Sequence, residues 1–497
     1  MRKTGYFFMS LMLCVSILLP AKSITAGNIE KTKARHAGAY FLASQFGDKA
    51  ITAESLKQVY EFTNNISDVA TLYVFNTADD RGFVIVSGSD CTDPIVAYST
   101  EGSFDPNNIP PNMMWWLNEQ ADFIAYTQNN QIAPAKETLA AWEELDNELL
   151  PYFGQNSKEI IRLTTSKWNQ EPLYNNMCPI DPTTGQRSVT GCVATAMAQI
   201  IYYWKYPLKG KGTWSYTWQG TTLEVVFAEA FYNYNNMVDQ LTDSSTSAQI
   251  NEVAKLGYHC GVAVEMDYGS NASGASSARV PTAFWKFFKY DKDSLRIINR
   301  ADSRYYNPNS TTSPNTKDSN WVNDIKYHIL KKRPVYYAGH SESGGTHARH
   351  AFVCDGWNTV TKTMHFNWGW GGSGDAWCNV YRSNLTAPNY VFTDEHIAVI
   401  GITPPKDSLP ADVNIVTVEN PTISEIYPNP AQDQITVCFQ LNGNANTAMQ
   451  IFDIAGREVK RAVVSPASNY VTISVKDLRP GVYICRLQGH SAKFIVK

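Results

Sequence analysis

The sequence predicts an α+β protein that ends in a small all-β domain. It has 497 residues, which at roughly 150 residues per domain corresponds to about three domains. Up to about residue 404, apolar residues at helical spacing alternate with short runs typical of strands. From residue 421 onward only short apolar runs remain, separated by turn residues, which is the pattern of a β-sandwich.

The composition excludes several classes of protein. Hydrophobic residues make up 43% and charged residues 18%, so the chain is too apolar for bulk disorder. The 42 basic and 46 acidic side chains leave a formal charge of −4, without the basic excess of a nucleic-acid-binding protein. We therefore expect a folded protein with no nucleic-acid partner.

Residues 1–26 have the pattern of a secretory signal peptide. Arg2 and Lys3 precede an apolar run, and small residues follow it near residue 26. The run is shorter than the roughly 20 residues of a spanning helix, so we expect export and no permanent membrane span. Of the nine cysteines, eight lie beyond this segment, and none forms a CxxC pair. A free thiol kept in an exported protein can be a nucleophile.

The next segment, residues 27–154, mixes the two kinds of pattern. Apolar spacing predicts helices at 37–46 and 113–128. Strand patterns lie at 69–75 and 82–87, and a turn at 77–81 joins them. The segment is therefore predicted to be α+β.

Residues 155–404 contain the first candidate for chemistry. Cys192 follows Gly191 and precedes a run of helix formers that extends to Ile201. At a helix N-terminus, the helix dipole and the free N–H groups favour the nucleophilic thiolate. By itself this pattern also fits an inert cysteine that begins a buried helix.

Three further elements make a catalytic interpretation more specific. His350 lies far downstream at the start of an apolar strand pattern and could act as the base for Cys192. Asn367 ends the next strand pattern and could orient the imidazole, while Trp368 could shield that contact from water. Gln170 lies upstream and could donate a hydrogen bond to a developing oxyanion.

These segments resemble the streptopain family of bacterial cysteine peptidases, which includes interpain. The similar motifs lie at 191–200, 266–269, 274–280, 334–337, 350–356 and 367–372. Upstream, residues 82–88 and 97–104 resemble the inhibitory prosegment of that family. The resemblance covers roughly residues 30 to 404.

The resemblance implies a papain-like domain at 155–404, with a helix at Cys192 on one side and antiparallel strands bearing His350 on the other. It implies a secreted cysteine endopeptidase that hydrolyses proteins or peptides. The enzyme would be made as a zymogen with residues 27–154 as its propeptide. Activation cuts would fall between about residues 144 and 165. No metal, nucleotide or organic cofactor is implied.

The resemblance also assigns roles to individual residues. Cys192 would be the nucleophile and His350 its acid and base, with Gln170 in the oxyanion hole. Asn367 and Trp368 would orient and shield the histidine.

One departure concerns the residues before His350. The family's glycine-rich loop runs directly into its histidine, whereas here His347 intervenes as a rival base. The strand that follows matches better with His350 as the base. Substrate binding would then involve Arg349, Ser276 and Ser277.

The C-terminal part resembles the sorting domain of the type IX secretion system of Bacteroidetes. The similar motifs lie at 426–430, 452–457 and 478–483. The clearest strand patterns lie at 435–440, 448–453, 470–475 and 481–487. A proline-rich linker at 405–420 precedes the domain at 421–497. The resemblance implies the type IX machinery as a partner and a location outside the cell or on its surface. We expect the processed form to be a monomer.

Two alternatives remain at this point. A metal site could use His340, His347, His350 and His365, but no HExxH motif is present. A catalytically silent adhesin built on a peptidase scaffold would also carry the C-terminal module.

Overall fold

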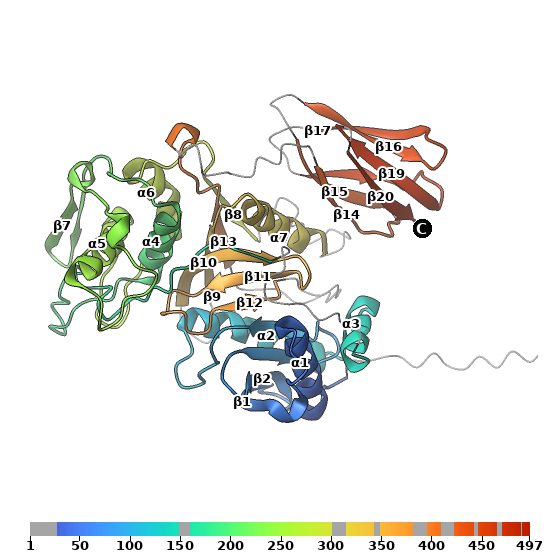
Figure 1. The fold of residues 1–497 in the computed structure, drawn as a ribbon, viewed down its shortest axis with the longest axis horizontal. Helices are drawn as coiled ribbons and strands as arrows, with labels where there is room; N and C mark the ends of the chain where they lie inside the picture. The colour runs from blue at the N-terminus through green and yellow to red at the C-terminus, as the bar shows by residue number, and fades with distance from the viewer. Residues whose placement is uncertain are drawn as a thin grey trace, which may run out of the picture.

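The computed structural model describes most of the chain. The described residues are 27–148, 160–300, 315–341, 348–380, 395–408, 422–441, 446–464, 470–488 and 490–497. The predicted signal peptide therefore lies outside them, as does most of the predicted linker. We call residues 27–148 the N-terminal segment, residues 160–408 the central domain and residues 422–497 the C-terminal domain (Figure 1).

The N-terminal segment is α+β, as predicted. Its elements are α1 (Lys31–Phe46), β1 (Leu56–Thr63), β2 (Ala70–Thr77), β3 (Phe83–Ser87), β4 (Ile95–Ser99), α2 (Pro111–Asn129) and α3 (Lys136–Asp146). Helix α1 begins before the predicted residue 37 because Ala34 is already buried against the sheet, although the rest of its first turn is polar. The predicted hairpin is confirmed, with Asp80 at a φ of 55° in its turn.

The central domain has a helical half and a strand half, which confirms the predicted two-part fold. The helical half holds α4 (Cys192–Trp204), β6 (Trp214–Trp218), β7 (Thr221–Val225), α5 (Ser247–Ala263) and α6 (Val280–Phe287). The strand half holds β5 (Ile160–Arg162), β8 (Arg296–Asn299), α7 (Asn315–Leu330), β9 (Val335–Ser341), β10 (Ala348–Asn358), β11 (Thr363–Asn367), β12 (Ala376–Cys378) and β13 (Glu395–Ile400). Figure 1 shows the two halves side by side, with α4 next to β10.

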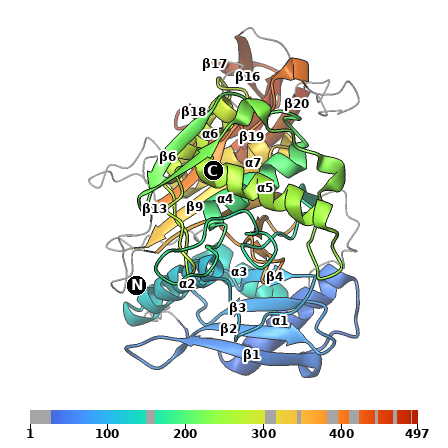
Figure 2. The same cartoon turned by 90° about the vertical axis from the view of Figure 1, so that its left-hand side faces the viewer.

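A single sheet joins the N-terminal segment to the central domain. Its strand order is β1-β2-β3-β4-β12-β11-β10-β9-β13-β8, and β5 pairs with β10. The joint is the antiparallel β4–β12 pair, in which Tyr98 lies opposite Trp377 and Ala97 opposite Cys378. Figure 2 shows the strands of the N-terminal segment below the central domain. The N-terminal segment thus covers an edge of the central sheet with backbone hydrogen bonds.

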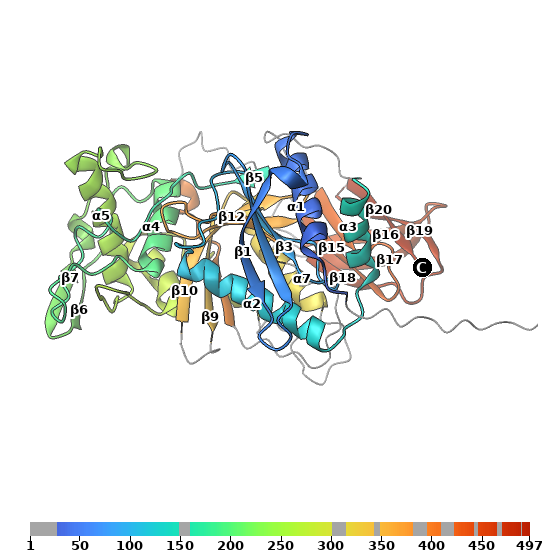
Figure 3. The same ribbon diagram turned by 90° about the horizontal axis from the view of Figure 1, so that it is seen from below.

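Helix α2 adds an apolar contact to this backbone joint. Trp115 and Trp116 belong to one buried cluster with Phe352 of β10 and Phe366 of β11. Figure 3 shows α2 running across the sheet, with one of its ends beside β10. Since this apolar surface is buried against residues from another part of the chain, the two parts stabilise each other.

The C-terminal domain is a β-sandwich, as predicted. Its strands are β14 (Thr422–Tyr427), β15 (Gln434–Gln440), β16 (Thr447–Asp453), β17 (Glu458–Val464), β18 (Tyr470–Ser474), β19 (Gly481–Leu487) and β20 (His490–Val496). They form the sheets β14-β15-β18 and β17-β16-β19-β20 around a core of alternating apolar residues. Among the described helices of the whole chain, none combines the length and the apolar character needed to cross a membrane.

Candidate active site

Cys192 is the first residue of α4, so the structure places the predicted nucleophile at a helix N-terminus. The residue before it, Gly191, has a φ of 87°, which a residue with a side chain rarely adopts. A Cβ atom there would lie 2.8 Å from Met266 Cε and 3.0 Å from the Ser273 carbonyl oxygen. Glycine is therefore required for the turn that presents the thiol.

The environment of the Cys192 thiol favours its protonated form. Burial raises the pKa of Cys192, and backbone N–H groups of Ala351, Val193 and Cys192 itself offset part of this rise. The hydrogen bond with Ala351 also shows that the start of β10 lies against the sulfur. In this state the thiol is held next to the strand that carries His350.

The His350 side chain lies on the other face of that strand. His350 pairs with Gly339 of β9, which pairs on its other side with His396 of β13. Paired residues of antiparallel strands face the same side, and here α2 covers that side. The neighbouring Ala351 instead packs in the cluster that contains α4. No hydrogen bond joins Cys192 to His350 in the described structure.

Burial also lowers the pKa of His350, to about 4. The ring is therefore neutral at pH 7 and carries no charge that would stabilise a thiolate. A thiolate–imidazolium pair is absent from the described site at neutral pH.

We expect alkylation of Cys192 in the full-length chain to depend strongly on pH. Because the pKa of Cys192 lies above its ordinary value, its reaction with iodoacetamide should accelerate about tenfold per pH unit from pH 7 past pH 9. Peptide mass spectrometry of the full-length chain would follow the Cys192 adduct, with the fully buried Cys260 as an unreactive control. A rate that is already constant at pH 7 would contradict the prediction.

Gln170 lies beside the nucleophile through backbone contacts. Its carbonyl oxygen accepts hydrogen bonds from the Thr190 N–H at 3.1 Å and from the Thr190 hydroxyl at 3.0 Å. Thr190 is two residues before Cys192, so the Gln170 segment is tied to the turn that begins α4. The structure thus brings the Gln170 backbone close to the N-terminus of α4.

Asn367 forms a buried network with α4 instead of with His350. Its Oδ1 accepts from Gln199 Nε2 of α4 and from the Gly369 N–H, both at 3.1 Å. Its Nδ2 donates to the Ser166 carbonyl at 2.7 Å and to Gln199 Oε1 at 3.1 Å. In the described residues no hydrogen bond connects Asn367 to His350. The network fixes the end of β11 and the segment before Gln170 to α4.

Gln199 is a residue that the sequence did not suggest. It follows Cys192 by two helical turns, a spacing that could have indicated its position on the same face of α4.

Trp368 lies on the His350 face of the sheet. Its ring centroid is 4.7 Å from that of Phe352, and its Nε1 donates to the Gly374 carbonyl at 2.8 Å. Trp116 of α2 packs against it at 6.4 Å. The indole is fully buried in this apolar cluster.

Of the three residues expected to bind substrate, the structure describes the side chains of Ser276 and Ser277 but not that of Arg349. The Ser277 hydroxyl lies 2.8 Å from the Tyr336 hydroxyl on β9, and Tyr336 is close enough to Cys192 to interact electrostatically. Ser276 directly precedes the short helical turn that holds Ser277. Arg349 lies on β10, but its side chain is outside the described residues, and so is all of His347.

Helix α2 of the N-terminal segment reaches this site. Asn112 Nδ2 donates to the carbonyl oxygens of Trp368 at 2.6 Å and Ala351 at 3.4 Å. The Trp115 ring lies on Gly339, where an added Cβ would be only 1.9 Å from the indole. The sequence does not indicate a role for either residue, because nothing in a helix pattern shows which distant strand the helix will cover.

A buried histidine–carboxylate contact also crosses from α2 to the sheet. His396 Nε2 lies 2.9 Å from Glu119 Oε1, and His396 Nδ1 lies 2.6 Å from the Tyr337 hydroxyl. A carboxylate can only accept, so Nε2 carries a proton here. Both side chains are at most 4% exposed. The central domain therefore provides a polar partner for the buried carboxylate of α2.

A second buried pair lies behind the site. His365 Nδ1 is 2.6 Å from Asp355 Oδ1, and the Thr164 hydroxyl donates to Asp355 Oδ2. Burial acts to raise the pKa of Asp355, but His365 and the neighbouring donors hold it below its usual value. Asp355 lies within β10.

Comparison with known proteins identifies the three parts of the chain. Residues 168–378 match the peptidase C10 family, residues 26–124 the Spi protease inhibitor and residues 425–497 the secretion system C-terminal sorting domain. Streptopain of Streptococcus pyogenes is 30% identical over 356 residues, which cover 67% of this chain and 81% of streptopain. The chain belongs to the peptidase C10 family.

A further relative and a solved structure are also similar to this C10 peptidase. The thiol protease/hemagglutinin PrtT of Porphyromonas gingivalis is 28% identical over 440 residues, which cover 85% of this chain but only 46% of PrtT. The structure of a Prevotella intermedia prointerpain A fragment has a TM-score of 0.54 and 27% identity, and covers 70% of this chain and 99% of that fragment. These matches confirm the predicted cysteine peptidase and its papain-like fold.

The two flanking parts of the C10 peptidase are confirmed as well. The N-terminal segment is a prosegment of the Spi inhibitor type. The C-terminal domain is a sorting domain, which directs the protein to the cell surface or out of the cell.

Proposed function

We propose that this chain is the precursor of a secreted cysteine endopeptidase in which Cys192 attacks peptide bonds of protein substrates. The observation that carries the proposal is the position of Cys192, at the N-terminus of α4 and in hydrogen-bond contact with the Ala351 N–H. This contact puts the nucleophile one residue away from the base candidate. The helix N-terminus favours the thiolate once the site opens to solvent.

The proposed reaction follows the usual steps of thiol-dependent acyl transfer. His350 takes the proton of Cys192, and the thiolate attacks the carbonyl carbon of the substrate. The Gln170 side chain and the Cys192 N–H stabilise the oxyanion. His350 then protonates the leaving amine, and water releases the acyl-enzyme.

The supporting residues act by holding these groups in place. Asn367 connects β11 to α4 through Gln199 and, through the Ser166 carbonyl, keeps the segment before Gln170 in position. Trp368 shields the His350 face of the sheet. Ser276, Ser277 and Arg349 are proposed to contact the substrate. His347 remains a rival for the base, since no described contact tests it.

We also propose that the prosegment keeps the precursor inactive by separating Cys192 from His350. In the precursor the two side chains lie on different faces of β10, and Trp115 covers the His350 face. Cleavage within about residues 144–165 would release α2 and let the imidazole turn toward the sulfur. The processed enzyme is expected to act as a monomer.

The proposal is tested with a thiol-reactive peptide probe. The processed chain should form a covalent adduct at Cys192, located by mass spectrometry, whereas the precursor should react far more slowly. An unlabelled but folded processed chain would instead favour a binding protein on a peptidase scaffold.

Gln170→Ala should reduce kcat about 10²- to 10³-fold while KM changes little, because the lost donor acts on the transition state. Steady-state kinetics of the processed enzyme would measure both constants. Glu171→Ala, at the exposed neighbouring position, is the matched control. A loss confined to KM would remove Gln170 from the oxyanion hole.

A further inference from the structure

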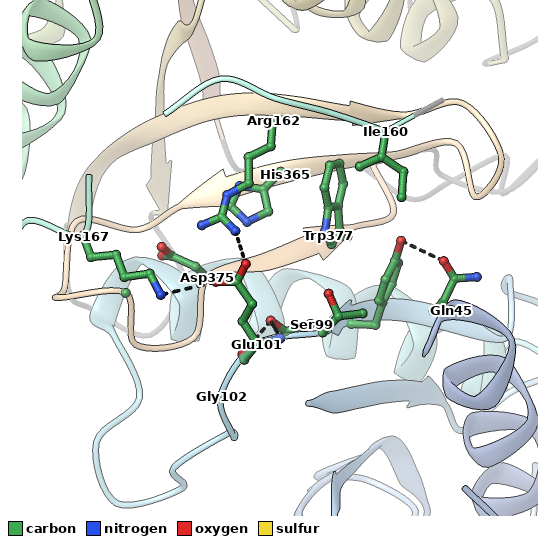
Figure 4. A pocket seen from close by; sticks show the side chains of 13 residues that line it. Gln45, Ser99, Glu101, Gly102, Ile160, Arg162, Lys167, His365, Asp375 and Trp377 are labelled. Atoms are coloured by element: carbon green, nitrogen blue, oxygen red, sulfur yellow. Dashed lines mark hydrogen bonds and ion pairs between the residues drawn. The ribbon is translucent and has the colours of Figure 1, made fainter. Parts of the chain in front are cut away.

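A polar cavity of about 370 Å³ lies between the prosegment and the peptidase domain (Figure 4). Prosegment residues Glu101 and Ser99 line it on one side. Arg162, Lys167 and His365 of the peptidase domain line it on the other. None of these residues has a role in the proposed reaction.

Glu101 is bound by two cations in this cavity. Arg162 Nη1 lies 2.7 Å from Glu101 Oε1, and Lys167 Nζ lies 3.3 Å from Glu101 Oε2. Burial acts to raise the pKa of Glu101, but Arg162, Lys167 and more distantly His365 hold it below its usual value. Figure 4 shows the carboxylate between the two cationic side chains. The cavity thus already contains a bound carboxylate supplied by the chain itself.

The cations are held by the peptidase domain and not by the prosegment. Arg162 lies on β5, opposite Gly356 of β10. The stem of Lys167 packs against Gly372, where a Cβ would come within 2.9 Å of Lys167 Cδ. The Gly371 N–H donates to the Trp168 carbonyl at 3.0 Å and closes this loop over the Lys167 segment. The backbone positions of Arg162 and Lys167 are therefore set by the peptidase domain and not by Glu101.

A third group, Asp375, lies at the back of the cavity. Its Oδ2 is buried and has no hydrogen-bond partner among the described residues. Burial raises the pKa of Asp375 to about 6, so this carboxyl is mostly ionised at pH 7 and can donate a hydrogen bond to a ligand oxygen only at lower pH. The nearby Asp355 is paired with His365 and Thr164.

We propose that Arg162 and Lys167 form a carboxylate-binding subsite of the peptidase domain. Glu101 fills it in the precursor, and an acidic side chain of another polypeptide fills it after the prosegment leaves. The second half of the proposal rests on the proposed processing, with the cut in the part of the 144–165 window that precedes β5, so that Arg162 stays with the peptidase domain. Because Lys167 lies three residues before Gln170, a ligand held there lies next to the segment that leads to the active site.

The first test uses the full-length Cys192→Ala precursor, so that it needs no catalysis. Adding Glu101→Ala removes the built-in carboxylate and leaves both cations in place. Propionate, titrated against chloride at constant ionic strength, should then raise the melting temperature by about 2 °C with saturation. The same chain with Glu101 intact should not respond.

Two matched variants make this test specific. Glu61→Ala removes the carboxylate of another solvent-exposed ion pair, with Lys31, and should show no response. Glu101→Ala combined with Arg162→Gln should lose the response. No rise in Glu101→Ala, or an equal rise in Glu61→Ala or with sulfate, would overturn the proposed subsite.

The second test uses processed wild-type peptidase with its thiol blocked. A capped peptide with the sequence of residues 99–103 should raise the melting temperature, and the same peptide with glutamine at position 101 should not. Equal effects of the two peptides would overturn binding in trans. Failure of the catalytic proposal would leave the precursor test unaffected.

Discussion

Replacing Cys192 with alanine is expected to reduce peptide hydrolysis by the processed chain at least about 10⁴-fold, because no other group in the described site can form the acyl-enzyme. The substitution should leave the fold intact, since Cys192 is only partly buried and alanine is well tolerated in the first turn of a helix. Intact mass over time in reducing buffer is the first measurement. Loss of the N-terminal segment only in the chain with Cys192 would show self-activation.

A matched control separates this effect from general damage. Cys260→Ala removes a fully buried thiol from α5 and should retain hydrolysis. If neither full-length form is cleaved, the chain is processed with an outside protease and assayed with peptides. Normal turnover by Cys192→Ala would remove the assignment of the nucleophile.

Glu119→Ala is expected to lower the free energy of unfolding of the precursor by about 1–3 kcal/mol, since it leaves the buried His396 Nε2–H without its acceptor. The pair joins α2 to His396, so the same change should loosen the prosegment and speed its removal. Urea unfolding of the Cys192→Ala precursor measures the stability, and the rate of processing in the chain with Cys192 measures the latency.

Glu119→Gln is the control for this prediction. It keeps an acceptor oxygen for His396 and loses only the charge, so its cost should be clearly smaller. A change of less than 1 kcal/mol for Glu119→Ala would show that the pair does not hold α2 on the sheet.

Sequence patterns were sufficient where the information is local. Cys192 could be placed at a helix N-terminus because Gly191 and the following helix formers are adjacent in the chain. The hairpin of the prosegment and the strands of the C-terminal domain follow from alternation and turn residues. The family could be recognised from motifs at the catalytic positions.

Contacts between distant segments could not be predicted in this way. The Asn367–Gln199 pair joins residues 168 positions apart, and only the packing of β11 beside α4 brings them together. The same holds for Asn112, Trp115 and Glu119, whose helix pattern says nothing about the strand that they cover.

The sequence alone determined which groups can do the chemistry, because side-chain type and local helix or strand preference are properties of short segments. Only the tertiary structure decided which of these groups meet. In the precursor, the pairing of β10 with β9 puts His350 on the face covered by α2, while Cys192 lies against Ala351. The alternation of side chains along a strand is the physical reason: adjacent residues point to opposite faces, and the packing on each face sets their partners.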